Sequence, residues 1–384
     1  MKKTYLIIAA TALVALSACS KNEVRPASSD PQEITFQTVV GGVKTKALSG
    51  SKVAFNGDKF KSYAWFLPQG KTWAQNSAAA EAYISDAEIS SNSKDANGKK
   101  IWKDADHTYY WPKQGSLTFF SWTKLGTDTK ANFENAAVDC SNSNGIVITD
   151  YSVVTNKNQD LMVADIAADR TENKLTYETS GVPTLFRHKL TKVAVALKIN
   201  DEYVKDANAS THSIGDKVFT VKSISFNNIA KEGTYTQGYD GKTDSWTSES
   251  ASSTASESIS VFSSQAGKTL TTTETKISDD GAQYIFLPQS FVSSTNASDN
   301  AANERVANLK IVYTIDTYYT DSQYSTEEVT IVRSLENPTA AAGSQKWEKN
   351  KDIVYKITIG LDEILWDPAV ENWDSQEEID IPLY

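Results

Sequence analysis

The sequence predicts an all-β protein made of antiparallel β-sandwiches. The first observation is an alternation of apolar and polar residues with a period of two, which places successive apolar side chains on one face of a strand. In residues 190–199, for example, Val193, Val195, Leu197 and Ile199 share one face. The second observation is that no long segment has the apolar pattern of an amphipathic helix. Short half-buried strands of this kind are typical of sandwiches.

The first half of the chain contains four clear candidate strands. They lie at residues 34–40, 61–68, 115–123 and 145–154. Each is rich in aromatic or β-branched residues, which favour strands. Residues 76–90 are rich in alanine, and we expect one short helix there.

The second half alternates more regularly. Residues 308–316 and 352–361 each align their apolar side chains on one face. Gly181 and Pro183 interrupt the pattern, and we expect a boundary between two β-rich halves near them. Serine and threonine make up 19 of the 36 residues in 243–278, which predicts a solvated surface excursion that forms strands only in part.

Composition excludes two classes of partner. The chain has 384 residues, 40% of them hydrophobic, which is enough for about two domains with their own cores. Its net charge is -10. Nucleic acid needs a basic surface to neutralise its phosphates, and anionic lipid headgroups also attract basic residues. We therefore expect no nucleic-acid partner and no electrostatic binding to anionic lipid.

Candidate catalytic and metal-binding residues are scarce. The histidines are His107, His188 and His212, and none has the spacing of a metal motif such as HExxH. The only cysteines are Cys19 and Cys140, so a zinc site made of cysteine pairs is impossible. We expect Cys140 to be a small buried residue and His188 to have a structural role. The sequence predicts no catalytic residue, no cofactor and no metal.

The beginning of the chain predicts export. Lys2 and Lys3 form a positive region, and the apolar residues 6–16 are too few to span a membrane. The Leu-Ser-Ala-Cys sequence that ends at Cys19 resembles a bacterial lipobox. In that pattern residues 1–18 are a signal peptide, and the thiol of Cys19 receives a diacylglycerol. The polar residues 19–33 are then a tether.

The strand at residues 34–40 is followed by an open, basic segment. Ile34, Phe36 and Val40 lie on one face of this strand, and two glycines end it. Residues 43–47, Val-Lys-Thr-Lys-Ala, then predict a flexible loop that a trypsin-like protease can bind in an extended form.

Several motifs, in order along almost the whole chain, resemble one family. The sequence is similar to fimbrillin-family lipoproteins, the type V pilins of Bacteroidales. The matching segments are the lipobox at Cys19, ITFQTVV (34–40), YYWPKQGSLTFFSW (109–122), DLMVA (160–164), FRHKLTKVAVALKI (186–199), LPQSF (287–291) and ILWDPAVENWD (364–374).

The resemblance implies two transthyretin-like β-sandwich domains, at residues 34–182 and 183–384, and no enzymatic activity. It also implies a route of export, proteolytic processing and assembly. Family pilins reach the outer membrane as lipoproteins carrying lipid such as palmitate on the cysteine that corresponds to Cys19. An Arg- or Lys-specific surface protease then removes the lipidated end with the first strand. A strand from another pilin subunit fills the open groove, which builds a fimbrium at the cell surface.

On this route, residues 34–46 are the removable strand and loop. The displaced strand carries Ile34, Phe36 and Val40, and the cut falls between Lys46 and Ala47. Lys44 is the alternative site, and it is also open whether either lysine is cut.

The donor strand is expected at the C-terminus, within residues 374–384. Ile379, Ile381 and Leu383 alternate there as the apolar residues of the first strand do. Pro382 lacks an N–H group, so it fits only an edge or a favourably phased position in a sheet.

The alternative is an uncleaved surface lipoprotein. Its first strand would be permanent, and the protein would act as a pilus anchor or tip, or as a glycan-binding module. A host or bacterial surface receptor is a further expected partner, since adhesion is the function that both alternatives share.

Overall fold

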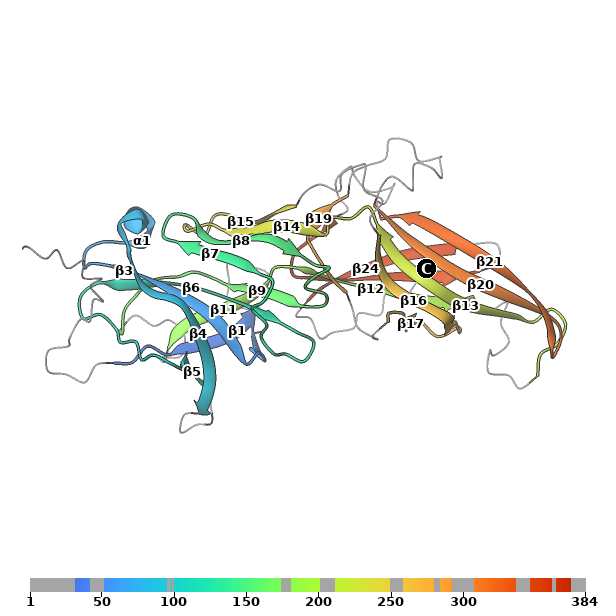
Figure 1. Cartoon of the computed structure of the whole chain (residues 1–384), viewed down its shortest axis with the longest axis horizontal. Helices are drawn as coiled ribbons and strands as arrows, with labels where there is room; N and C mark the ends of the chain where they lie inside the picture. The colour runs from blue at the N-terminus through green and yellow to red at the C-terminus, as the bar shows by residue number, and fades with distance from the viewer. Residues whose placement is uncertain are drawn as a thin grey trace, which may run out of the picture.

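The structure is a computed structural model that describes residues 32–41, 52–94, 98, 100–173, 181–200, 211–248, 258–279, 284–291, 307–335, 346–360 and 364–373. The described part is elongated and almost entirely β (Figure 1). The prediction of an all-β sandwich protein is therefore confirmed.

Strands of the first half form a closed circuit, called the ring below. Each strand pairs with the next in the order β6, β3, β4, β5, β1, β11 and β9, and β9 pairs again with β6. All neighbours are antiparallel except β1 and β11, because a closed circuit with an odd number of strands needs one parallel pair. The strands of this sheet are β1 (Phe36–Gly41), β2 (Lys52–Ala54), β3 (Lys59–Leu67), β4 (Glu81–Lys94), β5 (Lys100–Asp104), β6 (Ser116–Leu125), β9 (Asp160–Ala164), β10 (Ala167–Arg170) and β11 (Val182–His188).

The expected helix at residues 76–90 is mostly a strand, so that prediction is wrong. A single helical turn, α1 (Trp73–Asn76), and a 3₁₀ turn, η1 (Ser77–Ala79), precede β4. Pairing with β3 and β5 and burial of Ile84, Ala87 and Ile89 inside the ring override the helix propensity of alanine.

A second sheet joins the two halves of the chain. Strand β8 of the first half pairs with β14 of the second, so strand pairing crosses the boundary predicted at residue 183. The division into domains 34–182 and 183–384 stays a prediction. The strands of this sheet, in spatial order, are β15 (Asp244–Ser248), β14 (Glu232–Gln237), β8 (Gly145–Ser152) and β7 (Ala137–Ser141).

The rest of the second half forms two facing sheets that share one apolar core. In the first sheet β12 pairs in parallel with β23, and β24 pairs with the other edge of β23. The serine- and threonine-rich segment forms β15, β16 and β17 in its described parts, so much of it is strand. The first sheet contains β12 (Thr191–Ile199), β17 (Thr275–Lys276), β18 (Tyr284–Phe286), β23 (Lys351–Ile359) and β24 (Ile364–Asn372); the second contains β13 (Lys217–Asn227), β16 (Ser258–Thr269), β20 (Asn308–Thr320) and β21 (Gln323–Ser334); β19 (Gln289–Ser290) and β22 (Lys346–Trp347) pair separately.

Candidate functional site

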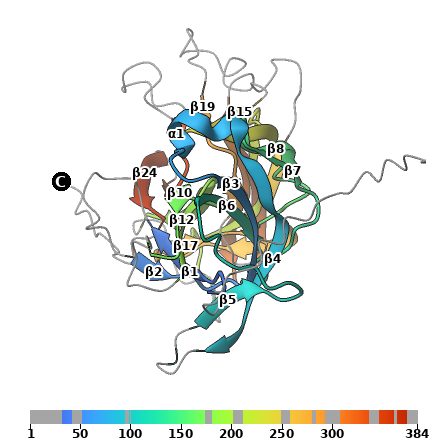
Figure 2. The same cartoon turned by 90° about the vertical axis from the view of Figure 1, so that its left-hand side faces the viewer.

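Strand β1 is the element that closes the ring. On one side it pairs in parallel with β11, from Phe36 opposite Val182 to Val40 opposite Phe186. On the other side it meets Trp102 of β5 and then the short strand β2. Figure 2 shows β1, β2 and β5 together at one side of this end of the molecule. Removing β1 would therefore leave the facing edges of β11 and β5 without a strand between them.

The preceding residues extend the pairing of β1 toward its N-terminal end. The Ile34 N–H donates to the Tyr109 carbonyl at 2.8 Å, and the Trp111 N–H donates to the Gln32 carbonyl at 3.0 Å. At the start of β11, the Val182 N–H donates to the Thr35 carbonyl at 2.6 Å. Residues 32–41 thus pair continuously with neighbouring segments and fill one strand position of the ring.

The inward face of this segment is apolar. The side chains of Ile34, Phe36 and Val40 are buried with at most 6% exposure. Phe36 meets the rings of Phe60 and Phe119 edge to face, at centroid distances of 5.5 and 5.7 Å. Each such buried side chain stabilises the fold by about 1.5–3 kcal/mol, so the three together contribute roughly 5–9 kcal/mol.

Two further contacts fix the position of β1. Lys103 of β5 forms a salt bridge with Glu33, with 3.0 Å between Nζ and Oε1. Gly181 has a φ of +87°, and a Cβ built on it would lie 2.9 Å from the carbonyl carbon of Phe36. The absence of a side chain at Gly181 therefore allows β1 to approach the start of β11 closely.

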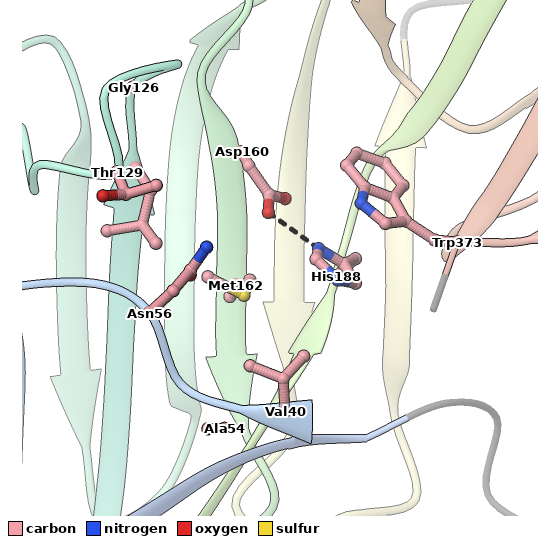
Figure 3. Close-up of a pocket in the computed structure, with 10 residues that line it drawn as sticks. Val40, Ala54, Asn56, Gly126, Thr129, Asp160, Met162, His188 and Trp373 are labelled. Atoms are coloured by element: carbon pink, nitrogen blue, oxygen red, sulfur yellow. Dashed lines mark hydrogen bonds and ion pairs between the residues drawn. The ribbon is translucent and has the colours of Figure 1, made fainter. Parts of the chain in front are cut away.

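A cavity of about 230 Å³ lies at the end of β1, and Figure 3 shows it. His188, at the end of β11, makes a contact of 2.7 Å between its Nδ1 and Asp160 Oδ2, and its ring stacks on Trp373 at 4.3 Å. This gives His188 a structural role and holds the chain just after β24 next to the end of β1. The lining residues are Val40, Ala54, Asn56, Leu125, Gly126, Thr129, Asp160, Met162, His188 and Trp373.

A buried charge cluster lies where the chain passes from β11 to β12. The Lys189 side chain is 1% exposed, and its Nζ lies 3.2 Å from Asp244 Oδ1. Lys349 Nζ lies 2.8 Å from Asp244 Oδ2, and the Tyr235 hydroxyl donates to Asp244 Oδ1 at 2.6 Å. Burial lowers the pKa of Lys189 to about 8. These contacts join β14 and β15 to the start of β12.

Neighbouring groups offset the effect of burial on the pKa of Asp244. Burial raises the pKa of the Asp244 carboxyl, but Lys189, Lys349 and the Tyr235 hydroxyl outweigh that effect. The pKa of Asp244 is therefore held well below its ordinary value, and the carboxylate stays charged at neutral pH.

The other candidate side chains have structural surroundings. Cys140 is half-buried, and burial raises the pKa of its thiol to about 12, so the reactive thiolate is scarce at neutral pH. His212 stacks on Tyr318, with ring centroids 3.8 Å apart. Within the described residues, no three His, Cys, Asp or Glu side chains gather as metal ligands. No helix in the same part of the chain is long and apolar enough to cross a membrane.

The structure describes only part of the predicted site. Ile34, Phe36 and Val40 lie together on the buried face of one strand. Cys19, the cut at Lys44 or Lys46–Ala47, and Ile379, Ile381 and Leu383 lie outside the described residues.

A sequence model of the family described as fimbrillin-like matches residues 41–373. The chain belongs to the fimbrillin-like family. This confirms the resemblance inferred from the motifs. The fimbrillin-like chain is a structural protein and not an enzyme, with a role in a pilus or in adhesion at the cell surface. Its family indicates other pilin subunits as partners.

Of two solved structures similar to this chain, one supports the fold. A fimbrial protein from Bacteroides vulgatus is 16% identical with a TM-score of 0.53, and the match covers 88% of this chain and 99% of that one. The tip fimbrial protein Mfa3 from Porphyromonas gingivalis is 9% identical with a TM-score of 0.33, covering 89% and 100%. No curated protein sequence matches the fimbrillin-like chain. Only the first similarity is close enough to support an argument, and at that identity it concerns the fold alone.

Several residues of the site were not found by sequence reasoning. Lys103 lies in a short strand whose partner is distant in sequence. Lys189 follows a histidine and an arginine in a basic run, which gives no sign that its side chain is buried. Gly181 interrupts the strand pattern in the sequence, and a glycine at such a point is a recognisable candidate for the positive φ that the structure has there.

Proposed function

We propose that this fimbrillin-like chain is a pilus subunit that is exported as a lipoprotein, processed near Lys46 and assembled by strand exchange. The observation that carries the proposal is the position of β1. It closes the ring between β11 and β5, and it is the described strand nearest to the lipidation motif. A single cut after β1 would separate the anchored end from the rest of the fold.

The groove left by β1 would favour a replacement strand. It would expose the backbone edges of β11 and β5 and an apolar floor that includes Phe60, Phe119 and Trp102. Backbone edges give affinity for any extended peptide, and side-chain pockets select which peptide binds. A strand donated by a second copy leaves that copy's own groove open, so the contact propagates as a fibre.

The predicted cut at Lys46–Ala47 falls between β1, which ends at Gly41, and β2, which begins at Lys52. After such a cut β1 would be held only by non-covalent contacts. The lipid on Cys19 would leave with it, which takes the subunit from the outer membrane into the fimbrium.

Two experiments test this route. Intact mass and N-terminal sequencing of the protein from cell surfaces should give a chain that begins at Ala47 and carries no lipid. Deleting residues 379–384 should abolish fibres without preventing export. A surface chain that keeps an acylated Cys19, or normal fibres from the truncated chain, would contradict the proposal.

The cut site has its own test. Changing both Lys44 and Lys46 to glutamine should leave the lipidated precursor at the outer membrane, because the protease of the proposed route needs a basic residue. Unchanged processing of that double variant would place the cut elsewhere.

A second candidate function is that of an uncleaved adhesion or glycan-binding lipoprotein. The observation that favours it is at the end of the molecule opposite α1, which the β20–β21 hairpin reaches (Figure 1). Tyr319 and Tyr324 are each 53% exposed there, and exposed aromatic rings can stack on sugars. If this candidate is right, Y319A/Y324A should lose binding to a mucin-coated surface, while the control variant Tyr110→Ala keeps it.

A further inference from the structure

The C-terminal residues repeat the pattern of the strand that closes the ring. Residues 32–39 read Gln-Glu-Ile-Thr-Phe-Gln-Thr-Val, and residues 377–384 read Glu-Glu-Ile-Asp-Ile-Pro-Leu-Tyr. In both, an acidic residue precedes an isoleucine, and a second large apolar residue follows two positions later. We infer that residues 377–384 of a second copy take the place of residues 32–39 in one register, which Lys103 selects through Glu378. This inference rests on the proposed strand exchange.

The positions in the ring assign a role to each donor residue. Ile379 takes the place of Ile34 and Ile381 that of Phe36, both of which are at most 4% exposed. Leu383 takes the place of Thr38, which lies on the same face of the strand. All three apolar side chains of the donor are then directed toward the core of the ring.

The charged contact favours registers in which an acidic donor residue stands opposite Lys103. The Lys103 ammonium lies 3.0 Å from the Glu33 carboxylate, and Glu33 would leave with β1. In the inferred register Glu378 stands where Glu33 stood. A glutamate then replaces a glutamate opposite Lys103, whereas the register shifted by two residues would offer Asp380, whose side chain is one CH₂ group shorter.

The two neighbouring registers fit less well. A shift by two residues in one direction places Glu377 at the position of Ile34, where a carboxylate would be buried at 3% exposure. A shift by two in the other direction places Ile381 and Leu383 at Ile34 and Phe36, but it puts Ile379 at the position of Gln32, which is exposed, so only two apolar side chains of the donor are directed inward. A shift by one residue turns every apolar side chain outward.

Gly181 makes room for the proline of the donor. Pro382 falls at the position of Gln37, whose nitrogen would lie only 3.2 Å from a Cβ built on Gly181. Proline carries a ring carbon on its nitrogen, and glycine opposite it leaves space for that carbon. The donor loses the ladder hydrogen bond of that position, because proline has no N–H group.

Cysteine cross-linking in the full-length chain tests the register. Val182 lies opposite Phe36, so Val182→Cys should pair with the donor residue that takes the place of Phe36. Neighbouring strands are about 4.8 Å apart, within the range for a disulfide. In a Cys140→Ser background, V182C with I381C should give a ladder of cross-linked subunits on a non-reducing gel.

The same acceptor cysteine reports the other registers. V182C with I379C, or V182C with L383C, should give no ladder, and a ladder from either would overturn the inferred register. Normal fibres with no ladder from any of the three pairs would also overturn it. If deleting residues 379–384 leaves fibres intact, the proposed strand exchange itself fails, which is a different result.

A charge exchange tests the role of Lys103. K103E and E378K should each slow fibre growth about two- to five-fold, in line with an exposed ion pair replaced by like charges. The double variant K103E/E378K should recover most of the rate, because the pair is restored with its signs exchanged. Lys310→Glu, on an exposed position of β20, is the matched control and should grow normally. Equal rates for wild type and both single variants would remove Lys103 from the selection of register.

Discussion

Gly181 shows how a single residue without a side chain lets β1 approach β11 closely. We expect Gly181→Ala to lower the free energy of unfolding by about 1–3 kcal/mol, because φ is +87° and the new Cβ would meet the backbone of β1. Gly70→Ala is the matched control, with a φ of +83° and no atom within 4 Å of its Cβ. Urea unfolding of both variants separates backbone strain from the contact with β1. Equal losses of unfolding free energy in the two variants would mean that the contact between the new Cβ and β1 does not destabilise the fold.

At the same scale, Asp244 holds two lysines at the junction of the strands. Asp244→Asn leaves the buried Lys189 ammonium without its carboxylate, so we expect a loss of about 3 kcal/mol at pH 7. The pKa of Asp244 is lowered in the folded state, so its contribution is complete above the ordinary value of 3.8 and is lost as pH falls below it.

The measurement is the difference in unfolding free energy between wild type and Asp244→Asn across pH 3–7. The difference should be constant in the upper part of this range and should shrink below about pH 4. Asp139→Asn, which changes an exposed carboxylate on β7, serves as the control. A difference that did not change with pH would show that the effect is not electrostatic.

Among the elements, β1 depends on a few aromatic contacts for its place in the ring. We expect Phe36→Ala to lower the free energy of unfolding of the uncleaved chain by about 3–5 kcal/mol. The substitution would leave a new cavity between the rings of Phe60 and Phe119, and these large side chains cannot easily move to fill it. Val39→Ala, on the opposite face of the strand, should cost much less. Hydrogen exchange at residues 36–40 should rise selectively in Phe36→Ala. If both variants lost the same stability, the inward face would not be what holds β1.

The elements also show which features the sequence could predict. The alternation in residues 190–199 is local, and the structure has it as β12. The alanines near residue 80 favour a helix locally, but two neighbouring strands that are not adjacent in sequence make the segment a strand. The pairing of β8 with β14 and the burial of Lys189 likewise depend on contacts over long sequence separations, for which period and composition carry no signal.

At the scale of the whole molecule, a continuous path joins the groove to the C-terminal segment. β11, which pairs with β1, continues through Lys189 and Leu190 directly into β12. β12 pairs with β23 from Thr191 to Ile199, and β23 pairs with β24 along its whole length. Tension applied along these ladders would load many hydrogen bonds at once rather than one after another. Under the proposed strand exchange, this arrangement would suit the transmission of force from the groove left by β1 to the C-terminal segment.

The last prediction concerns the cost of losing β1 in the intact molecule. A chain with a specific protease site introduced into residues 42–51 can be cut in vitro, and the released β1 peptide can be removed in mild urea. We expect the melting temperature to fall by more than about 5 °C, because roughly 5–9 kcal/mol of apolar burial is lost. A synthetic peptide of residues 374–384 should restore it in a concentration-dependent way, since a ligand of the folded state stabilises that state. The control peptide, with serine in place of Ile379, Ile381 and Leu383, should not. Recovery with both peptides would mean that backbone pairing alone fills the groove, and recovery with neither would mean that the C-terminal segment is not its occupant.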